Sequence, residues 1–407
     1  MTVVEARQHP TPADFAPAPT EADRTRWEEA DRAARPRRLV RLRERLAAEG
    51  IDAYYGVTHE NVRYLTGFAL GDGEDGGSSG QFLVGAEDVL LFADSRYTIQ
   101  AARQAPDARI ETVYGDLPER WPTLVGSVGA RRVAVEAAFV SQAMWGRLAA
   151  ASPDVELVPV EGWIEADRAT KEPSELERVA AACAVADRAL AALLPAIRPG
   201  RTELEVAMDL EWAIRTGGAD ALAFDVACLA GPEAALPHGS PGDRPILSGA
   251  VLLFDFGAQV AGYRSDMTRT LFVGDPSPRD LSIYRLVAEA QAAAIGALTE
   301  AAKDGRPITG READGIARRV IDEAGQGERF GHGTGHGIGL AVHEQPSLGK
   351  RSPEAPLPSP TVFSVEPGVY VEGETGVRIE DLVTYEPAHG RVERLTRFPR
   401  EILVVGR

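Results

Sequence analysis

Cysteine, lysine and long apolar runs are scarce in this chain of 407 residues. The two cysteines, Cys183 and Cys228, are too few for a disulfide framework and fit a reducing cytosol. No basic stretch followed by an apolar run opens the chain, so we expect no secretory signal and a cytoplasmic location. No uninterrupted apolar segment approaches the ~20 residues that span a bilayer, so we expect no membrane partner.

Positive charge is also in short supply. The chain has 44 Lys and Arg residues against 61 Asp and Glu, which gives a formal net charge of -17. Nucleic acids and anionic membranes are bound through clustered cations, so we expect neither as a partner. The basic residues include only three lysines: Lys171, Lys303 and Lys350.

The chain divides into an arm and two domains. Residues 1–35 are rich in Ala, Pro, Asp and Glu and predict an N-terminal arm, with a short helix near residues 20–34. Residues 36–166 alternate between strand-like runs and amphipathic stretches, which predicts a small α/β domain whose first helix begins at Pro36. A glycine-rich loop at residues 71–80 lies between two of its strands.

The second domain spans residues 171–407. Capping boxes at Thr202 and Thr309, each with a glutamate three residues later, predict the starts of two helices. Strand-like segments are frequent from residue 250 onward. Together they predict an α+β domain in which helices pack on a largely antiparallel sheet. No repeat of fixed short period is present, which disfavours a solenoid.

Five carboxylate and imidazole side chains stand in apolar or glycine-rich segments of this domain: Asp255, Asp266, His336, Glu366 and Glu380. An isolated carboxylate in such surroundings is unfavourable, and it normally neutralises itself or finds a cation. Four carboxylates and one imidazole suit two divalent metal ions, an arrangement used for metal-assisted hydrolysis. We therefore interpret the chain as a dinuclear metallohydrolase.

The two aspartates flank a predicted hairpin. The strand-like runs that contain Asp255 and Asp266 are separated by a tight turn at Ala261–Gly262. Because side chains alternate along a strand, a two-residue turn places both carboxylates on one face, directly opposite or one diagonal step apart. Two surface aspartates near a turn are the alternative, and the neighbouring Phe254 and Phe256 argue against it.

Glycines alternate with other residues in GHGTGHGIGL, residues 331–340. So many glycines make a poor helix, so we predict an extended strand. The glycines then form one face, which lets another backbone approach closely, while both imidazoles point toward one site from the other face. A single buried histidine is more often structural than a ligand. This domain, however, holds four of the seven histidines in glycine- or proline-rich stretches: His238, His332, His336 and His343.

The two glutamates lie among apolar residues of predicted strands. Glutamates are unusual in a strand interior unless they are paired or bind a metal. Arg378 lies on the same strand face as Glu380, so we expect it to hold that carboxylate by a charge-assisted bond. An Arg–Glu pair without a metal would account for Glu380 alone. One arginine cannot compensate four carboxylates.

In their order along the chain, these segments resemble the metallopeptidases of the pita-bread fold, specifically Xaa-Pro aminopeptidases and Xaa-Pro dipeptidases (prolidases). The resemblance covers residues 36–407. Beyond the ligand segments it rests on NVRYLTGF (61–68), DSRYTIQA (94–101), TKEPSELERV (170–179) and ALPHGSPGDRPI (235–246). It implies an N-terminal α/β domain of the creatinase/prolidase type and a C-terminal α+β pita-bread catalytic domain.

The resemblance also implies a reaction. Asp266 and Glu380 would bridge two divalent ions, with Asp255 completing one metal's shell and His336 and Glu366 the other's. A hydroxide held between the metals would attack the carbonyl before proline. Bound water loses much of its proton affinity beside divalent cations, so such a site works near neutral pH.

Further residues receive roles from the same resemblance. Glu366 would also shuttle a proton to the leaving nitrogen, and His238 and His343 would contact the substrate carbonyl and stabilise the tetrahedral intermediate. His332 and Arg378 would orient the ligands. Hard carboxylates with one imidazole suit Mn²⁺, and Co²⁺ or Zn²⁺ would also fit. The expected substrate is a small peptide with proline at its second position, and the expected assembly is a homodimer.

Two departures concern specificity. Prolidases often carry an arginine soon after the HExP motif that holds a dipeptide's free carboxylate. Here Ser347 follows Pro346, with Lys350 and Arg351 close by. The glycine usual before the VEPG motif is also absent from PLPSPTVFSVEPG. Dipeptides, longer Xaa-Pro peptides and non-peptide amides therefore all stay open as substrates.

Two other functions compete with the peptidase. A hydrolase of small non-peptide amides, similar to creatinase or the ectoine-derivative hydrolases, would share the fold. Creatinase-like members have lost metal ligands, whereas all five are intact here. A catalytically silent module that binds histones or nucleic acid would show eroded ligands and often a strongly charged tail. This chain has intact ligands and no basic patch.

Overall fold

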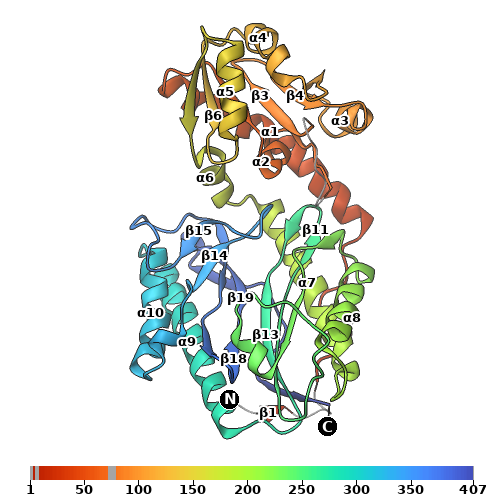
Figure 1. Ribbon diagram of the computed structural model, residues 1–407. Helices are drawn as coiled ribbons and strands as arrows, with labels where there is room; N and C mark the ends of the chain where they lie inside the picture. The colour runs from red at the N-terminus through yellow and green to blue at the C-terminus, as the bar shows by residue number, and fades with distance from the viewer. Residues whose placement is uncertain (1–2, 5–8, 72–78, 407) are drawn as a thin grey trace. The chain divides into compact units, whose positions relative to one another are not determined.

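The computed structural model describes residues 3–4, 9–71 and 79–406 (Figure 1). Two compact units make up the chain. Residues 25–168 form the N-terminal unit, and residues 169–407 together with residues 1–24 form the C-terminal unit. Most of the glycine-rich loop expected at residues 71–80 lies outside the described residues.

The N-terminal unit is built on a mixed six-stranded sheet. In spatial order its strands are β5 (Arg109–Thr112), β4 (Val89–Ala93), β3 (Gln81–Val84), β2 (Ala53–Gly56), β6 (Arg132–Glu136) and β7 (Glu156–Val160). Its helices are α1 (Glu21–Ala48), α2 (His59–Thr66), α3 (Thr98–Gln104), α4 (Leu117–Ser127), α5 (Gln142–Ala151) and α6 (Trp163–Ala169). β3 is antiparallel to both neighbours, and the other pairs are parallel. Tyr55, Phe92 and Trp121 pack in its core, so the predicted α/β fold is confirmed.

Helix α1 is continuous through Pro36, so the predicted helix start at that residue is wrong. A proline inside a helix removes one backbone hydrogen bond. Asp31 bridges the proline, because its carboxylate accepts hydrogen bonds from Arg38 at 2.9 Å and from Arg35 at 3.5 Å, and all three side chains are buried. Buried ion pairs thus stabilise α1 around Pro36. The pattern of apolar residues does not show these pairs, so it does not predict that the helix continues through the proline.

The C-terminal unit contains two five-stranded sheets. One sheet has the order β1 (Val3–Val4), β21 (Ile402–Val405), β13 (Met267–Val273), β10 (Val251–Phe256) and β9 (Ala227–Ala230). The other has the order β15 (Glu344–Leu348), β14 (Gly335–Gly337), β16 (Thr361–Val365), β19 (Asp381–Glu386) and β20 (Arg391–Arg394). A three-stranded sheet has the order β12 (Tyr263–Arg264), β11 (Ala258–Val260) and β8 (Ala221–Leu222). A two-stranded sheet consists of β17 (Gly368–Val371) and β18 (Thr375–Arg378).

Helices cover these strands on both sides. Figure 1 shows α7 (Pro173–Leu193) and α8 (Glu203–Thr216) on one side, and α9 (Pro278–Lys303) and α10 (Gly310–Glu323) on the other. The capping boxes predicted at Thr202 and Thr309 are present at the starts of α8 and α10. Most strand pairs are antiparallel, and β21 is parallel to β1 and β13. The predicted α+β architecture, with helices on a largely antiparallel sheet, is thereby confirmed.

The hairpin that contains the two aspartates also forms as predicted. β11 and β12 meet at Ala261–Gly262, both with positive φ (46° and 83°), the conformation of a tight two-residue hairpin turn. In the same register Asp255 pairs with Thr268 across β10 and β13. Asp266 is two residues before Thr268, so both carboxylates lie on one face, one diagonal step apart.

Helix α7, with its continuation to Ala196, is long and apolar enough to cross a bilayer by length and composition. Two thirds of that apolar window are buried inside the unit, including Val179, Cys183 and Leu190. This is the pattern of a core helix. Both cysteines of the chain are free thiols in buried positions.

Candidate metal centre

All five residues predicted to bind metals line one cavity of about 630 Å³ in the C-terminal unit. Asp255 lies near the end of β10, Asp266 directly precedes β13, and His336 is in the middle of β14. Glu366 directly follows β16, and Glu380 directly precedes β19. The same cavity is lined by the other residues predicted for the site: His238, His332, His343 and Arg378.

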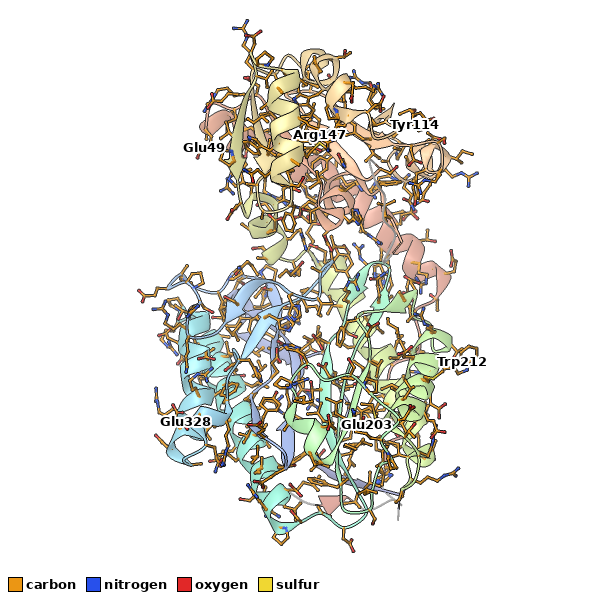
Figure 2. The ribbon with its side chains drawn as sticks, viewed as in Figure 1. Glu49, Tyr114, Arg147, Glu203, Trp212 and Glu328 are labelled. Atoms are coloured by element: carbon orange, nitrogen blue, oxygen red, sulfur yellow. The ribbon has the colours of Figure 1, made fainter. Side chains whose placement is uncertain are left out.

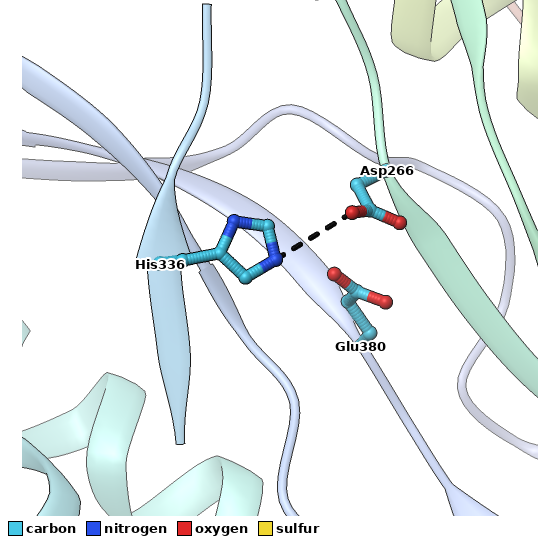
Figure 3. Close-up of side chains that lie close together, drawn as sticks. All are labelled: Asp266, His336 and Glu380. Carbon is cyan, nitrogen blue, oxygen red and sulfur yellow. Dashed lines mark ion pairs between the residues drawn. The ribbon is translucent and has the colours of Figure 1, made fainter. Parts of the chain in front are cut away.

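Three of these side chains form a tight cluster of potential ligand atoms. One atom each from Asp266, His336 and Glu380 lies within 4.8 Å of the others (Figure 3). His336 Nε2 is 3.6 Å from Asp266 Oδ2 and 3.2 Å from Glu366 Oε1. The backbone carbonyl of Gly337, 3.1 Å from Nδ1, can only accept a hydrogen bond and so places the proton on Nδ1. In the neutral ring the Nε2 lone pair is therefore available to a cation, which would replace the proton that Nε2 carries in the metal-free protein.

Unpaired carboxylate oxygens indicate what the cavity is built to hold. In the described part of the chain, Asp255 Oδ1, Asp266 Oδ1 and Glu380 Oε1 are buried and have no hydrogen-bond partner. Unpaired buried oxygens of this kind are strongly unfavourable without a counter-ion. Oxygen donors with one imidazole suit hard or borderline divalent cations, so the residues present fit such ions.

The pKa values of Asp266 and Glu380 are raised, as expected of crowded, buried carboxylates. Burial raises the pKa of Asp266 well above its ordinary value, and the neighbouring carboxylates of Glu380, Asp255 and Glu366 raise it further. Burial and the charges of Glu366 and Asp255 raise the pKa of Glu380 to about 8. A bound cation stabilises the ionised form of each group, so the cluster is arranged for positive charge.

Glu366 and His336 form an ion pair at the edge of this cluster. Burial opposes ionisation of Glu366, but the hydrogen bond and charge of His336 lower its pKa to about 2. Burial likewise opposes the charged form of His336, but Glu366 raises the pKa of that imidazole to about 9. Glu366 is therefore ionised at neutral pH, as a general base has to be.

The glycine-rich segment behaves as predicted around β14. A Cβ atom at Gly335 would lie 1.9 Å from the carbonyl oxygen of Ser364, and one at Gly337 would lie 2.2 Å from that of Gln345. Both neighbouring strands therefore approach β14 more closely than any side chain would permit. The imidazole of His336 is consequently held at the cavity by backbone on both sides.

The predicted bond between Arg378 and Glu380 is wrong. Arg378 Nη2 donates to Asp255 Oδ2 at 2.6 Å. Its Nε donates to Thr268 Oγ1 at 2.7 Å, and that hydroxyl donates to Glu380 Oε2 at 2.8 Å. Thr268 occupies the space between the two side chains, so Arg378 holds Glu380 only through the threonine. The guanidinium thus orients two carboxylates of the cavity, Asp255 directly and Glu380 through Thr268.

Three supporting residues were missed by sequence reasoning: Thr268, Ser364 and Tyr370. The Ser364 hydroxyl accepts the backbone N–H of His336 at 3.0 Å and donates to Glu366 Oε1 at 2.9 Å. Hydroxyl residues are common in strands, and their sequence positions carry no signal of these bonds. The only available clue was proximity, since each lies within four residues of a predicted ligand.

His332 belongs to a chain of hydrogen bonds that ends on Asp255. Its Nδ1 donates to the carbonyl of Gly333 at 2.7 Å, so Nε2, 2.8 Å from the Tyr370 hydroxyl, is the acceptor of the neutral ring. Burial lowers the pKa of His332 and favours this neutral form. Tyr370 in turn accepts from Arg378 Nη1 at 2.9 Å. His332 therefore acts on the cavity through Tyr370 and Arg378.

The two remaining histidines face the open part of the cavity. His238 and His343 are both solvent-exposed, and the His343 ring lies 4.3 Å from that of His336 between centroids. Ser347 does not line the cavity and its hydroxyl bonds to that of Ser352 at 2.9 Å. Lys350 and Arg351 are exposed and do not line the cavity either.

Comparisons with known proteins agree with this architecture. Residues 177–386 match the profile of metallopeptidase family M24, and residues 38–170 match that of the creatinase/prolidase N-terminal domain. An uncharacterized peptidase of Bacillus subtilis (strain 168), YqhT, is 36% identical over 368 residues, which cover 90% of this chain and 100% of the relative.

Two solved structures are similar over nearly the whole chain. The Xaa-Pro dipeptidase from Bacillus anthracis has a TM-score of 0.81 at 34% identity, covering 91% of this chain and 99% of that one. The X-Pro aminopeptidase from Thermotoga maritima MSB8 has a TM-score of 0.80 at 34% identity, covering 90% and 99%. With its cluster of unpaired carboxylates and these matches, the chain belongs to metallopeptidase family M24.

Proposed function

We propose that this protein hydrolyses the Xaa-Pro bond of small peptides with the help of two divalent metal ions, Mn²⁺ being the native one. The observation that carries the proposal is the convergence of five acid and imidazole side chains on one cavity, three of them with unpaired buried oxygens. The named similar structures, a dipeptidase and an aminopeptidase that act on X-Pro peptides, support the substrate class.

The chain's own residues divide into ligands and reacting groups. Asp255, Asp266, His336, Glu366 and Glu380 would hold the ions. When bound, divalent cations generate a strong nucleophile from water near neutral pH and polarise the scissile carbonyl. Glu366, ionised at neutral pH, takes the proton of the attacking water and passes it toward the proline nitrogen that leaves.

The exposed histidines act on the substrate side. His238 and His343 face the open cavity, where they can donate hydrogen bonds to the oxygen of the scissile carbonyl as charge develops on it. Arg378 and Thr268 keep the carboxylates of Asp255 and Glu380 in fixed orientations. Among the described residues, Oδ1 of Asp255 and Oε1 of Glu380 have no hydrogen-bond partner and would be free to bind the ions.

Hydrolysis of three peptides tests this function: Ala-Pro, Ala-Pro-Ala and Ala-Ala-Ala, each with chelator-treated protein before and after addition of Mn²⁺. We expect metal-dependent cleavage of the proline peptides and none of Ala-Ala-Ala. The preference between the first two separates dipeptidase from aminopeptidase activity. Failure to cleave any peptide, in protein shown to contain two metals, would instead favour a small non-peptide amide.

We also propose that the protein is a cytoplasmic homodimer, and its assembly needs a test of its own. Leu204, Met208 and Trp212 form an exposed apolar row on α8, and Trp212 is 70% exposed. Figure 2 labels Trp212 on this helix. Such a row is a natural candidate for a subunit contact. We expect light scattering to give twice the chain mass for the wild type and the chain mass for Trp212→Glu. A monomeric wild type would contradict the dimer.

A further inference from the structure

The connection between β14 and β15, residues 338–343, carries His343 to the cavity. The register of the two strands shifts between His336 and Gly337, so a regular ladder of backbone hydrogen bonds does not continue into this connection. The His343 ring nevertheless lies in contact with that of His336, with 4.3 Å between centroids. Contacts outside this ladder hold the first half of the loop, where the backbone N–H and Nε of Arg264 donate to the carbonyls of Gly339 and Leu340 at 2.9 and 3.1 Å.

A buried ion pair holds the end of the loop. Lys171 Nζ lies 2.7 Å from Oε1 of Glu344, the residue after His343, and the two side chains are only 1% and 4% exposed. Glu344 Oε2 also accepts the backbone N–H of Ala341 at 3.4 Å, within the same loop. Glu344 is the first residue of β15 and points to Lys171, while His343 directly before it lines the cavity.

The surroundings of this pair leave it little freedom. The backbone N–H of Lys171 donates to the carbonyl of Pro360 at 2.8 Å, which fixes the base of the lysine. A Cβ atom at Gly339 would lie 2.4 Å from Glu344 Oε1 and 3.1 Å from Lys171 Cε. The space suits a slim ammonium stem better than a guanidinium fork, and lysine is rare in this arginine-rich chain.

We propose that the Lys171–Glu344 ion pair positions His343 for substrate and thereby sets the rate of peptide hydrolysis. The inference rests on the proposed function, in which His343 contacts the scissile carbonyl. Neither Lys171 nor Glu344 lines the cavity, so neither contacts substrate or metal. Loss of Lys171 removes the cation 2.7 Å from the buried Glu344 carboxylate, and removal of one partner of a buried ion pair is destabilising. The loop then shifts to hydrate the carboxylate and carries His343 away.

The first experiment compares Lys171→Met with Lys303→Met, a control at an exposed lysine at the end of α9. We expect Lys171→Met to lower kcat/KM for Ala-Pro-Ala roughly a hundredfold, the scale of a displaced catalytic group. The metal content of the purified variant, measured by elemental analysis, should stay at the wild-type value. Lys303→Met should match the wild type in both. Wild-type kcat/KM in Lys171→Met, or loss of its metal, would overturn the inference.

A double-mutant cycle with His343→Ala separates positioning from general loss of structure. If Lys171 acts through His343, Lys171→Met should lower kcat/KM by no more than about twofold when the imidazole is already gone. A full hundredfold further loss in the His343→Ala background would show that Lys171 acts elsewhere, and would overturn the inference.

A neutral pair keeps the test usable should Lys171→Met fold poorly. Lys171→Met/Glu344→Gln removes both charges of the pair, so we expect wild-type metal content and a kcat/KM at least tenfold higher than that of Lys171→Met. Where Lys171→Met does not fold, the double variant should have a kcat/KM within about tenfold of the wild type. A neutral pair that folds and binds metal but is as inactive as His343→Ala contradicts the account. A wild-type chain that cleaves no Xaa-Pro peptide overturns the proposed function itself, which is a separate result.

Discussion

At the scale of single residues, the account depends on charge that is buried and not neutralised by the chain itself. Arg378 is hydrogen-bonded to Asp255, and His336 is paired with Glu366. These two cations face five cavity carboxylates if Asp225 at its margin is included. Divalent ions would compensate this excess of negative charge.

Replacement of Glu366 by glutamine should remove the proton acceptor while keeping the size of the side chain. We expect Glu366→Gln to lower kcat by about 10²–10⁴, the usual contribution of a general acid–base group. Glu372→Gln, at an exposed glutamate six residues on, serves as the matched control and should retain activity. Unchanged kcat in Glu366→Gln, with equal thermal midpoints, would remove Glu366 from the mechanism.

The stability of metal-free protein should fall as the pH rises from about 5 to about 9. The folded chain raises the pKa of Glu380 from 4.5 to about 8 and that of His336 from 6.5 to about 9. In this window the folded cluster retains protons that the unfolded chain has released, so a rise in pH favours unfolding. The pKa of Glu366 is lowered from 4.5 to about 2, so its contribution to stability is lost only as the pH falls below about 4.5, outside this window.

Thermal midpoints measured across this pH range, with chelator and with saturating Mn²⁺, check that expectation. A bound cation keeps the carboxylates ionised and the imidazole unprotonated at Nε2, so the gap between the two curves should widen as the pH rises. Parallel curves would mean that these groups do not titrate with folding as described.

At the scale of secondary-structure elements, strand spacing around β14 determines where His336 lies. We expect Gly335→Ala to force β14 and β16 apart, because its Cβ would lie 1.9 Å from the carbonyl oxygen of Ser364. Metal affinity should fall roughly tenfold or more, the scale seen when ligand support is lost. Gly331→Ala is the control from the same segment, since a Cβ there meets nothing within 4 Å. Equal metal affinity of the two variants, by calorimetric titration, would refute this role of the glycine.

The element scale also shows what sequence patterns can and cannot predict. The alternation of side chains and the Ala261–Gly262 turn sufficed to place Asp255 and Asp266 on one face. The same alternation suggested an Arg378–Glu380 bond, but it carries no information on Thr268, which comes from another strand and lies between them. The predicted helix start at Pro36 is wrong because the spacing of apolar residues carries no information on the buried Asp31–Arg38 ion pair.

At the scale of the whole molecule, order along the chain was the strongest signal. The ligand segments come from both five-stranded sheets and the connections beside them, and no local pattern joins them. Their resemblance to a known family supplied the fold and the assembly of the site. The resemblance begins at residue 36 and so did not predict where the residues before it pack. Phe15 stacks on Phe398 at 6.1 Å and Arg24 pairs with Asp220 at 2.7 Å, so part of the expected arm packs on the C-terminal unit.

The most direct test of the central claim is a titration of chelator-treated protein with Mn²⁺, in which binding heat and cleavage of Ala-Pro-Ala are followed together. The account predicts that activity rises from zero with bound metal and reaches its plateau at two ions per chain. Full activity in protein shown to be free of metal, or saturated binding with no hydrolysis of any Xaa-Pro peptide, would contradict it.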